Sequence, residues 1–586
     1  MSSASNSTQK NHKLLIYQLL VRLFGNQNPT NKYYGSIEEN GCGKFNDIDA
    51  AALQEIRKMS FSHVWFTGVI EHATMTDYAY YGIKTDDPDV VKGRAGSPYA
   101  IKDYYDVDPD LAVDVNNRMA EFEDLIRRTH ENGLKVIIDF VPNHVARTYC
   151  SDQKPAGVKD IGEDDDNSKA FSPQNDFYYL PGKKFWVPGD VNPGGDEFQS
   201  VLKDGIFNEF PAKATGNDVF SEAPSINDWY ETIKLNYGVD YLNGHQTYFD
   251  PVPPLWLKLR DILLFWAEKG VDGFRCDMVE MVPVEFWSWI IKQVKEVYPE
   301  MIFIAEAYNP NVYRQYIFDG GFDYLYDKVG LYDTLKKLIC DDYNASVYEI
   351  RDQWQHQQNG ITQHMLRFLE NHDEVRIASN HFAGDAWLAL PAMILAATLA
   401  AGPLMIYSGQ EVAEPAEGTT GFSSSDGRTS IFDYCAMPEF QKWLDQGKMD
   451  GAKLSDSQKA LRAFYSKLLK ITSTHEAIKT GAFYDLLYLN ENDRGFNHKI
   501  YSFLRYTDQD RLLIIINFNK NEVNLQVKFT EDLLNQFQLL NQETHVFTDL
   551  LSGYKFSSNN LQQGLIVNLP ASSGIILSFN QLKIVS

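Results

Sequence analysis

Cysteine is scarce in this sequence. Five cysteines occur among 586 residues, and no two of them have the Cys-x-x-Cys spacing of a zinc or redox site. Their odd number and wide separation also exclude a disulfide framework of the kind that staples small secreted domains. We therefore expect Cys276, which lies inside a predicted strand, to be a small core residue and not a nucleophile.

A long apolar run is missing as well. The segment Leu14–Phe24 is apolar, but Arg22 interrupts it and it is too short to span a bilayer. Residues 1–12 are polar, show no secretory signal and are expected to be disordered. A cytoplasmic protein is the simplest interpretation. A secreted or periplasmic protein whose signal peptide has been removed is the alternative.

Positive charge is in deficit. The chain has 54 Lys and Arg against 79 Asp and Glu, which gives a formal net charge of −25. Nucleic acid and anionic membrane surfaces are therefore not expected as partners. A neutral substrate such as a sugar is not excluded by this charge. The length and an apolar share of 44% fit two or three domains around a large core.

A helix followed by a short strand stands out in the middle of the chain. The amphipathic segment Pro254–Glu268 ends before Gly270, and an apolar strand then runs into Arg275 and Asp277. Because a strand has a period of two, these two side chains share one face. In a closed parallel barrel that face is the interior, and the strand ends open into the active site. We expect Arg275 to keep Asp277 ionised, as a nucleophile requires.

Three further apolar strands finish in the same kind of residue. One ends in Asp139 and is followed by Asn143 and His144, one ends in Glu306, and one runs into Asn371-His372-Asp373. A single such cluster could be a solvated strand end or a helix cap. Four clusters in succession favour one shared catalytic face.

These four motifs, in this order, resemble the signature regions of the α-amylase superfamily, glycoside hydrolase family 13. They read Asp139-Phe-Val-Pro-Asn143-His144, Gly273-Phe-Arg275-Cys-Asp277, Glu306 after its strand, and Asn371-His372-Asp373. The segments Tyr99–Pro109 and Gly402–Glu411 match the family too. The resemblance implies an α/β fold: a (β/α)8 TIM barrel with a domain B inserted after the third strand and a C-terminal antiparallel β-sandwich.

The chain pattern divides in the same way. Between His144 and about Tyr248 the alternation of strands and helices stops, and from about Gly481 short strands separated by turns take over. The predicted domains are 1–144 and 249–478 for the two parts of the barrel, 145–248 for the insertion and 479–586 for the sandwich. Trp186 in the insertion is either a sugar platform or a packed core residue.

The resemblance also implies a mechanism and its residues. Asp277 is expected to be the nucleophile, Glu306 the acid and base, and Asp373 the group that holds sugar hydroxyls as the ring flattens. The predicted substrate-binding residues are Tyr99, His144, Arg275 and His372, with Asp139 bracing Arg275. The expected activity is retaining hydrolysis of α-1,4 bonds in α-glucans or maltooligosaccharides.

Two departures from the family pattern leave alternatives open. Many members that cleave α-1,4 bonds carry a Lys-His pair after the nucleophile strand, where this chain has Glu280 and Met281. The family often has a proline after the second strand, where this chain has Gly68. A transglycosylase or isomerase of the same superfamily is the alternative function. A non-catalytic binding relative is a remote one, because the three carboxylates are present.

No cofactor is expected to be required. Many members of the family hold a structural calcium between barrel and domain B, with the Asn of the first signature region, here Asn143, among its ligands. At the position that matches the acidic ligand from the end of domain B, this chain has Lys234. Because an ammonium group repels calcium and can donate to Asn143, we expect that site to hold no metal. A cation elsewhere, for example near Asn26, is left open.

Overall fold

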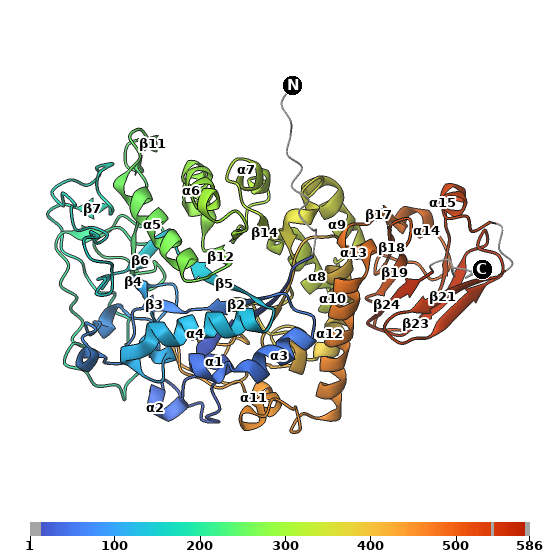
Figure 1. The fold of residues 1–586 in the computed structure, drawn as a ribbon, viewed down its shortest axis with the longest axis horizontal. Coiled ribbons are helices and arrows are strands. Elements are labelled where there is room, and N and C mark those ends of the chain that lie inside the picture. Colours follow the sequence, from blue (N-terminus) through green and yellow to red (C-terminus); the bar gives the residue numbers. More distant parts are fainter. Residues whose placement is uncertain (1–12, 541–543, 580–586) are drawn as a thin grey trace.

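The computed structural model describes residues 13–540 and 544–579. The predicted disorder of residues 1–12 therefore lies outside the described residues. Figure 1 shows three parts along the long axis, with a strand-and-helix barrel in the middle. The insertion between β6 and β11 lies at one end, and the C-terminal strands lie at the other.

Eight parallel strands form the central sheet. They are β1 (Leu15–Leu20), β2 (His63–Thr67), β5 (Lys135–Phe140), β12 (Gly273–Cys276), β13 (Ile302–Ala305), β14 (Tyr324–Tyr326), β15 (Met365–Leu366) and β16 (Leu404–Tyr407). The order in the sheet is β15-β14-β13-β12-β5-β2-β1-β16. A parallel bridge between Arg367 and Leu404 joins the two ends and closes the sheet. The predicted TIM barrel is confirmed.

Helices surround this barrel, because each helix buries its apolar face against the strands. They are α3 (Ala50–Lys58), α4 (Arg118–Glu131), α5 (Pro254–Glu268), α6 (Val284–Val297), α7 (Tyr313–Phe318), α8 (Asp333–Ile339), α9 (Val347–Asp352), α10 (Leu390–Thr398) and α12 (Asp456–Thr474). In α5 the residues Leu255, Leu259, Ile262 and Trp266 recur at helical spacing and are buried. The bounds predicted for α5 from the sequence agree with the structure.

The apolar segment Leu14–Phe24 is divided between two elements. The strand β1 ends at Leu20, and Val21–Phe24 forms the short helix α1. The next helix, α3, is capped by Asp49, whose side chain accepts the hydrogen bond from the Ala52 amide.

The insertion after β5 is built from short antiparallel pairs. β6 (His144–Ala146) pairs with β9 (Thr232–Lys234), β7 (Tyr179–Leu180) with β8 (Ala212–Lys213), and β10 (Val239–Asp240) with β11 (Gln246–Thr247). The β6–β9 pair ties the end of the insertion to its beginning, directly beside the barrel. Trp186 is 61% exposed, so it is not a packed core residue.

The C-terminal strands form a sandwich of two antiparallel sheets. One sheet contains β17 (Ala482–Asp485), β18 (Ile500–Tyr506), β19 (Arg511–Asn517), β24 (Ser573–Ser578), β21 (His545–Asp549) and β22 (Lys555–Ser558); the other contains β20 (Val523–Val527) and β23 (Leu565–Leu569). Their inner faces share one apolar core. Arg505 docks this domain on the barrel by donating to the carbonyls of Leu399, Ala477 and Ile478.

None of the helices in the described parts of the chain combines the length and the hydropathy needed to cross a membrane.

Candidate active site

Two neighbouring barrel strands deliver carboxylates to the same end of the barrel. Asp277 directly follows β12 and Glu306 directly follows β13, and the two strands pair in parallel. The Glu306 amide donates to the Cys276 carbonyl at 3.0 Å, so the hydrogen bonds between β12 and β13 continue up to the two carboxylate residues. Both side chains are buried. The pairing of the two strands therefore brings Asp277 and Glu306 together, as the sequence predicts.

Arg275 lies between these two carboxylates. Its guanidinium is fully buried and reaches Asp277 Oδ1 at 2.7 Å through Nη1 and Glu306 Oε1 at 2.6 Å through Nη2. The Nε atom donates to the Tyr326 hydroxyl at 3.1 Å. Because adjacent nitrogens of one planar group hold both carboxylates, the arginine fixes their relative positions.

Asp139 is a third carboxylate beside the guanidinium: its Oδ1 lies 3.5 Å from Nη1, the nitrogen that also contacts Asp277. Its Oδ2 accepts hydrogen bonds from Trp65 Nε1 at 3.0 Å and from the Gly68 amide at 3.3 Å. A proline at position 68 would lack this N–H, so the departure from the family pattern supplies a donor. Burial raises the pKa of Asp139 to about 6, against the opposing charge of Arg275.

The ionisation of Asp277 differs from the sequence expectation. Arg275 does contact the carboxylate, but burial and the nearby charge of Glu306 outweigh it and raise the pKa of Asp277 well above its ordinary value. Two carboxyl groups that face each other in a buried site resist losing both protons. In the unliganded site Asp277 therefore retains its proton to higher pH than an isolated aspartate would.

Two groups around Glu306 were missed by the sequence analysis. The hydroxyl of Tyr308 donates to Glu306 Oε1 at 2.7 Å, and the Met278 amide donates to Oε2 at 2.8 Å. Met278 has a left-handed backbone (φ 44°, ψ 46°), which points its N–H at the carboxylate. A tyrosine three residues after a strand cannot be distinguished from a core aromatic residue in the sequence, so no signal identified Tyr308.

Asp373, His372 and Tyr99 form a connected group, and the Tyr99 ring lies beside the guanidinium of Arg275. His372 Nε2 lies 2.5 Å from the Tyr99 hydroxyl and 3.2 Å from Asp373 Oδ2, and the rings of Tyr99 and His372 stack. Gln18 Nε2 holds His372 Nδ1 at 2.8 Å. Burial, and then the charge of Arg275, lower the pKa of His372 well below its ordinary value, so its ring is neutral.

Asp373 is the most accessible of the three carboxylates. Its side chain is 40% exposed, yet enough protein surrounds the carboxyl group that desolvation, followed by the charge of Glu306, raises its pKa to about 7. Its backbone is fixed by Asn371, whose Oδ1 accepts from the Asp373 and Glu374 amides at 2.9 Å each. The turn after β15 thus presents this carboxylate to the open side of the site.

His144 approaches from the insertion. It opens β6, opposite Lys234 of β9, and its Nδ1 lies 3.1 Å from Asn143 Nδ2. Burial, and then the charge of Lys234, lower the pKa of His144 to about 3, so the ring is neutral. A neutral ring offers one N–H donor and one acceptor, which suits an uncharged ligand with hydroxyl groups.

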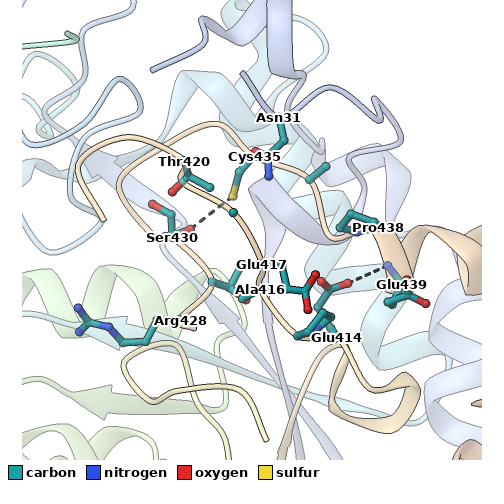
Figure 2. A pocket seen from close by; sticks show the side chains of 14 residues that line it. Asn31, Glu414, Ala416, Glu417, Thr420, Arg428, Ser430, Cys435, Pro438 and Glu439 are labelled. Carbon is teal, nitrogen blue, oxygen red and sulfur yellow. Dashed lines mark hydrogen bonds between the residues drawn. The ribbon is translucent and has the colours of Figure 1, made fainter. Parts of the chain in front are cut away.

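A separate pocket of about 120 Å³ lies beside the loop after β16. Figure 2 shows Glu414 pointing toward Glu439, whose amide donates to it at 2.9 Å, and Cys435 beside Ser430. None of Asp277, Glu306 and Asp373 lines this pocket. Its buried carboxylate is already satisfied by backbone donors, so the pocket is a packing feature and not the reaction site.

A model of the alpha-amylase catalytic domain matches residues 18–481, which include all the residues of the candidate active site. The chain belongs to the alpha-amylase family. The fold and the family predicted from the four motifs are both confirmed.

Alpha-amylase 2 of Dictyoglomus thermophilum is 22% identical over 516 residues, covering 87% of this chain and 70% of that protein. An alpha-1,4-glucan:maltose-1-phosphate maltosyltransferase of Cereibacter sphaeroides is 30% identical over 191 residues, covering 32% and 30%. The structure of a maltogenic alpha-amylase, AmyB of Thermotoga neapolitana, aligns with a TM-score of 0.61 at 18% identity, covering 97% and 99%.

In this alpha-amylase family member the usual interdomain calcium position contains an ammonium group. Lys234 Nζ donates to Asn143 Oδ1 at 2.9 Å and forms an ion pair with Asp218 Oδ1 at 2.5 Å. The Asn143 Nδ2 atom donates to the Gly216 carbonyl at 2.7 Å. Because a cation already satisfies the oxygens of Asn143 and Asp218, these residues do not fit a bound calcium ion.

Proposed function

We propose that this protein hydrolyses α-1,4-glucosidic bonds in α-glucans or maltooligosaccharides with retention of anomeric configuration. The observation that supports this proposal is the contact of one buried guanidinium, that of Arg275, with both Asp277 and Glu306. A retaining glycosidase needs two carboxyl groups a few ångströms apart on the two sides of the bond. The relatives named above act on the same class of glucan according to their names.

The reaction proceeds in two displacements. Asp277 attacks the anomeric carbon while Glu306 gives its proton to the leaving glycosidic oxygen, and the C–O bond to the leaving sugar breaks. Glu306 then takes a proton from water, whose oxygen displaces Asp277 from the same carbon. The active form carries one proton on the pair, with Asp277 ionised and Glu306 protonated.

The remaining site residues bind the reacting sugar. Asp373 accepts hydrogen bonds from its hydroxyls, and these bonds strengthen as positive charge develops on the ring. The neutral rings of His144 and His372 donate to other hydroxyls, and Tyr99 offers an aromatic face to the C–H side of the pyranose. Since the carboxyl pair supplies both nucleophile and proton, the proposal assigns no cofactor to the reaction.

Transglycosylation is the second candidate. It is favoured by the maltosyltransferase among the relatives and by Glu280, which stands where many α-1,4-cleaving members have lysine. Glu280 Oε1 accepts the Asn309 amide at 2.7 Å, so this carboxylate braces the loop that carries Tyr308. If an acceptor sugar binds beside this loop in place of the attacking water, it receives the glycosyl group from Asp277.

One chromatogram tests the proposal and separates the two candidates. The protein is incubated with maltoheptaose, cyclodextrin, pullulan and panose in separate reactions, and the products are resolved by size. Shorter products alone support hydrolysis, whereas products longer than the substrate show transfer. A lack of turnover on every α-glucan would overturn the proposal and favour a binding relative.

A further inference from the structure

We propose that Glu71, Asp103 and Asp152 bind a calcium ion that links the barrel to the insertion. Oxygen atoms of these three carboxylates lie within 4.8 Å of one another. Ligand oxygens on one calcium lie 2.3–2.6 Å from the ion and thus up to about 5 Å apart. The spacing suits calcium, and the proposal does not depend on the proposed reaction.

The strand register places two of these carboxylates opposite each other. Glu71 lies on β3 (Ile70–His72) and Asp103 on β4 (Ile101–Val107), and the two residues are direct partners across this antiparallel pair. Both side chains are buried. Like charges directly opposite each other destabilise a sheet, so this pairing requires a compensating positive charge or a proton.

The third carboxylate comes from the insertion, and its neighbours hold it in place. Ser151 Oγ donates to Asp103 Oδ1 at 2.5 Å, and the Gln153 amide donates to Asp103 Oδ2 at 2.9 Å. Asp152, between them, is exposed. A path from solvent therefore reaches the cluster, and water can complete the coordination of an ion.

The cationic group already present does not complete the cluster. Lys102 Nζ lies 3.1 Å from Asp86 Oδ2 and 3.7 Å from Glu71 Oε1. Within the described residues, Glu71 Oε2 and Asp86 Oδ1 are buried and have no hydrogen-bond partner. One ammonium group among the four carboxylates of Glu71, Asp86, Asp103 and Asp152 leaves an excess of negative charge. Glu71, one of the three clustered carboxylates, also keeps a buried oxygen without a partner among the described residues.

Protonation is the alternative means of removing that charge. Burial raises the pKa of Glu71 well above its ordinary value, and the charges of Asp106, Asp103 and Asp152 add to this effect. A bound divalent cation removes the same repulsion and also gives the free oxygen of Glu71 a partner. The two alternatives predict different responses of the wild-type protein to calcium, so they are experimentally separable.

The test uses the full chain after exhaustive dialysis against EDTA. Calcium chloride is titrated into the protein in a calorimeter, and the melting temperature is measured with and without about 10 mM calcium, above the weakest protein sites. We expect one equivalent to bind and the melting temperature to rise. Asp152→Asn should weaken binding at least tenfold, whereas the exposed Asp164→Asn, in the same insertion, should leave it unchanged.

Two further variants make the site assignment falsifiable. Glu71→Gln should lose the calcium response while remaining as stable as the calcium-free wild type, because it removes a buried charge. Asn143→Ala, at the position that Lys234 contacts, should keep the response. Binding that survives in both Asp152→Asn and Glu71→Gln would overturn the proposal. So would an absence of heat and of any melting shift in the wild type, which would favour a protonated Glu71.

Discussion

The Tyr308 hydroxyl donates a 2.7 Å hydrogen bond to Oε1 of Glu306, the carboxylate proposed as acid and base. This bond helps to fix the position of the carboxylate, which Arg275 also contacts. A Tyr308→Phe variant removes the bond. We expect its kcat to fall about tenfold, the effect of one hydrogen bond to a charged group, measured as initial rates on a maltooligosaccharide.

A matched control is available elsewhere in the chain. The Tyr348 hydroxyl donates to Glu491 Oε2 at 2.9 Å, and neither residue lies in the site. Tyr348→Phe removes the same type of bond and should leave kcat unchanged. If Tyr308→Phe keeps the wild-type kcat, the Tyr308 hydroxyl has only a packing role.

The raised pKa of Asp373, about 7, predicts a pH-dependent stability of the unliganded protein. In the unfolded chain this group titrates near 3.9, so between about pH 4 and 7 the folded state binds more protons. Its contribution to folding stability therefore decreases as the pH rises through this window.

An Asp373→Asn variant should not show this loss of stability at high pH, because the amide does not ionise. Its melting temperature relative to wild type should be higher at pH 8 than at pH 5. The expected gain at pH 8 is on the order of 1 kcal/mol, because solvent screens the exposed part of the side chain. A difference that is the same at both pH values would contradict the assignment of the raised pKa to Asp373.

The buried ammonium of Lys234 is predicted to stabilise the junction of barrel and insertion. Lys234→Met leaves Asn143 Oδ1 without this donor and Asp218 without this partner. We expect a loss of about 1–3 kcal/mol of stability, measured as a lower melting temperature. Calcium should not restore it, because the variant supplies no new carboxylate. Full recovery on addition of calcium would show that a metal can occupy this position after all.

The sequence predicted the barrel and the place of its site because both depend on local patterns. Asp277 and Glu306 are recognisable because each follows a short apolar run. In a parallel sheet the ends of neighbouring strands lie side by side, which brings the two carboxylates together. The bounds of α5 were predictable for the same reason, since its apolar residues recur at helical spacing.

Interactions between distant segments could not be predicted. The balance that raises the pKa of Asp277 depends on its burial and its distance to Glu306, which no local pattern encodes. Glu71 and Asp152 are far apart in sequence, and only the β3–β4 register and the insertion bring them to one place. The division of the apolar segment Leu14–Phe24 after Leu20 is likewise not visible in the sequence.

Removal of the proposed nucleophile is the strongest mutational test. Asp277→Asn should lower turnover at least ~10⁴-fold, equivalent to about 5.5 kcal/mol of barrier. It should also fold and melt no lower than wild type, because a buried carboxyl group with a raised pKa is replaced by a neutral amide. A correctly folded variant that keeps a tenth of the wild-type rate would exclude Asp277 as nucleophile.

The stereochemistry of the first product tests the two-displacement account most directly. A concentrated sample of the protein is mixed with a maltooligosaccharide, and anomeric proton signals are followed by NMR before mutarotation equilibrates them. Two displacements at one carbon restore its configuration, so the α-anomer should appear first. A β-anomer appearing first would show a single displacement and contradict the covalent role of Asp277.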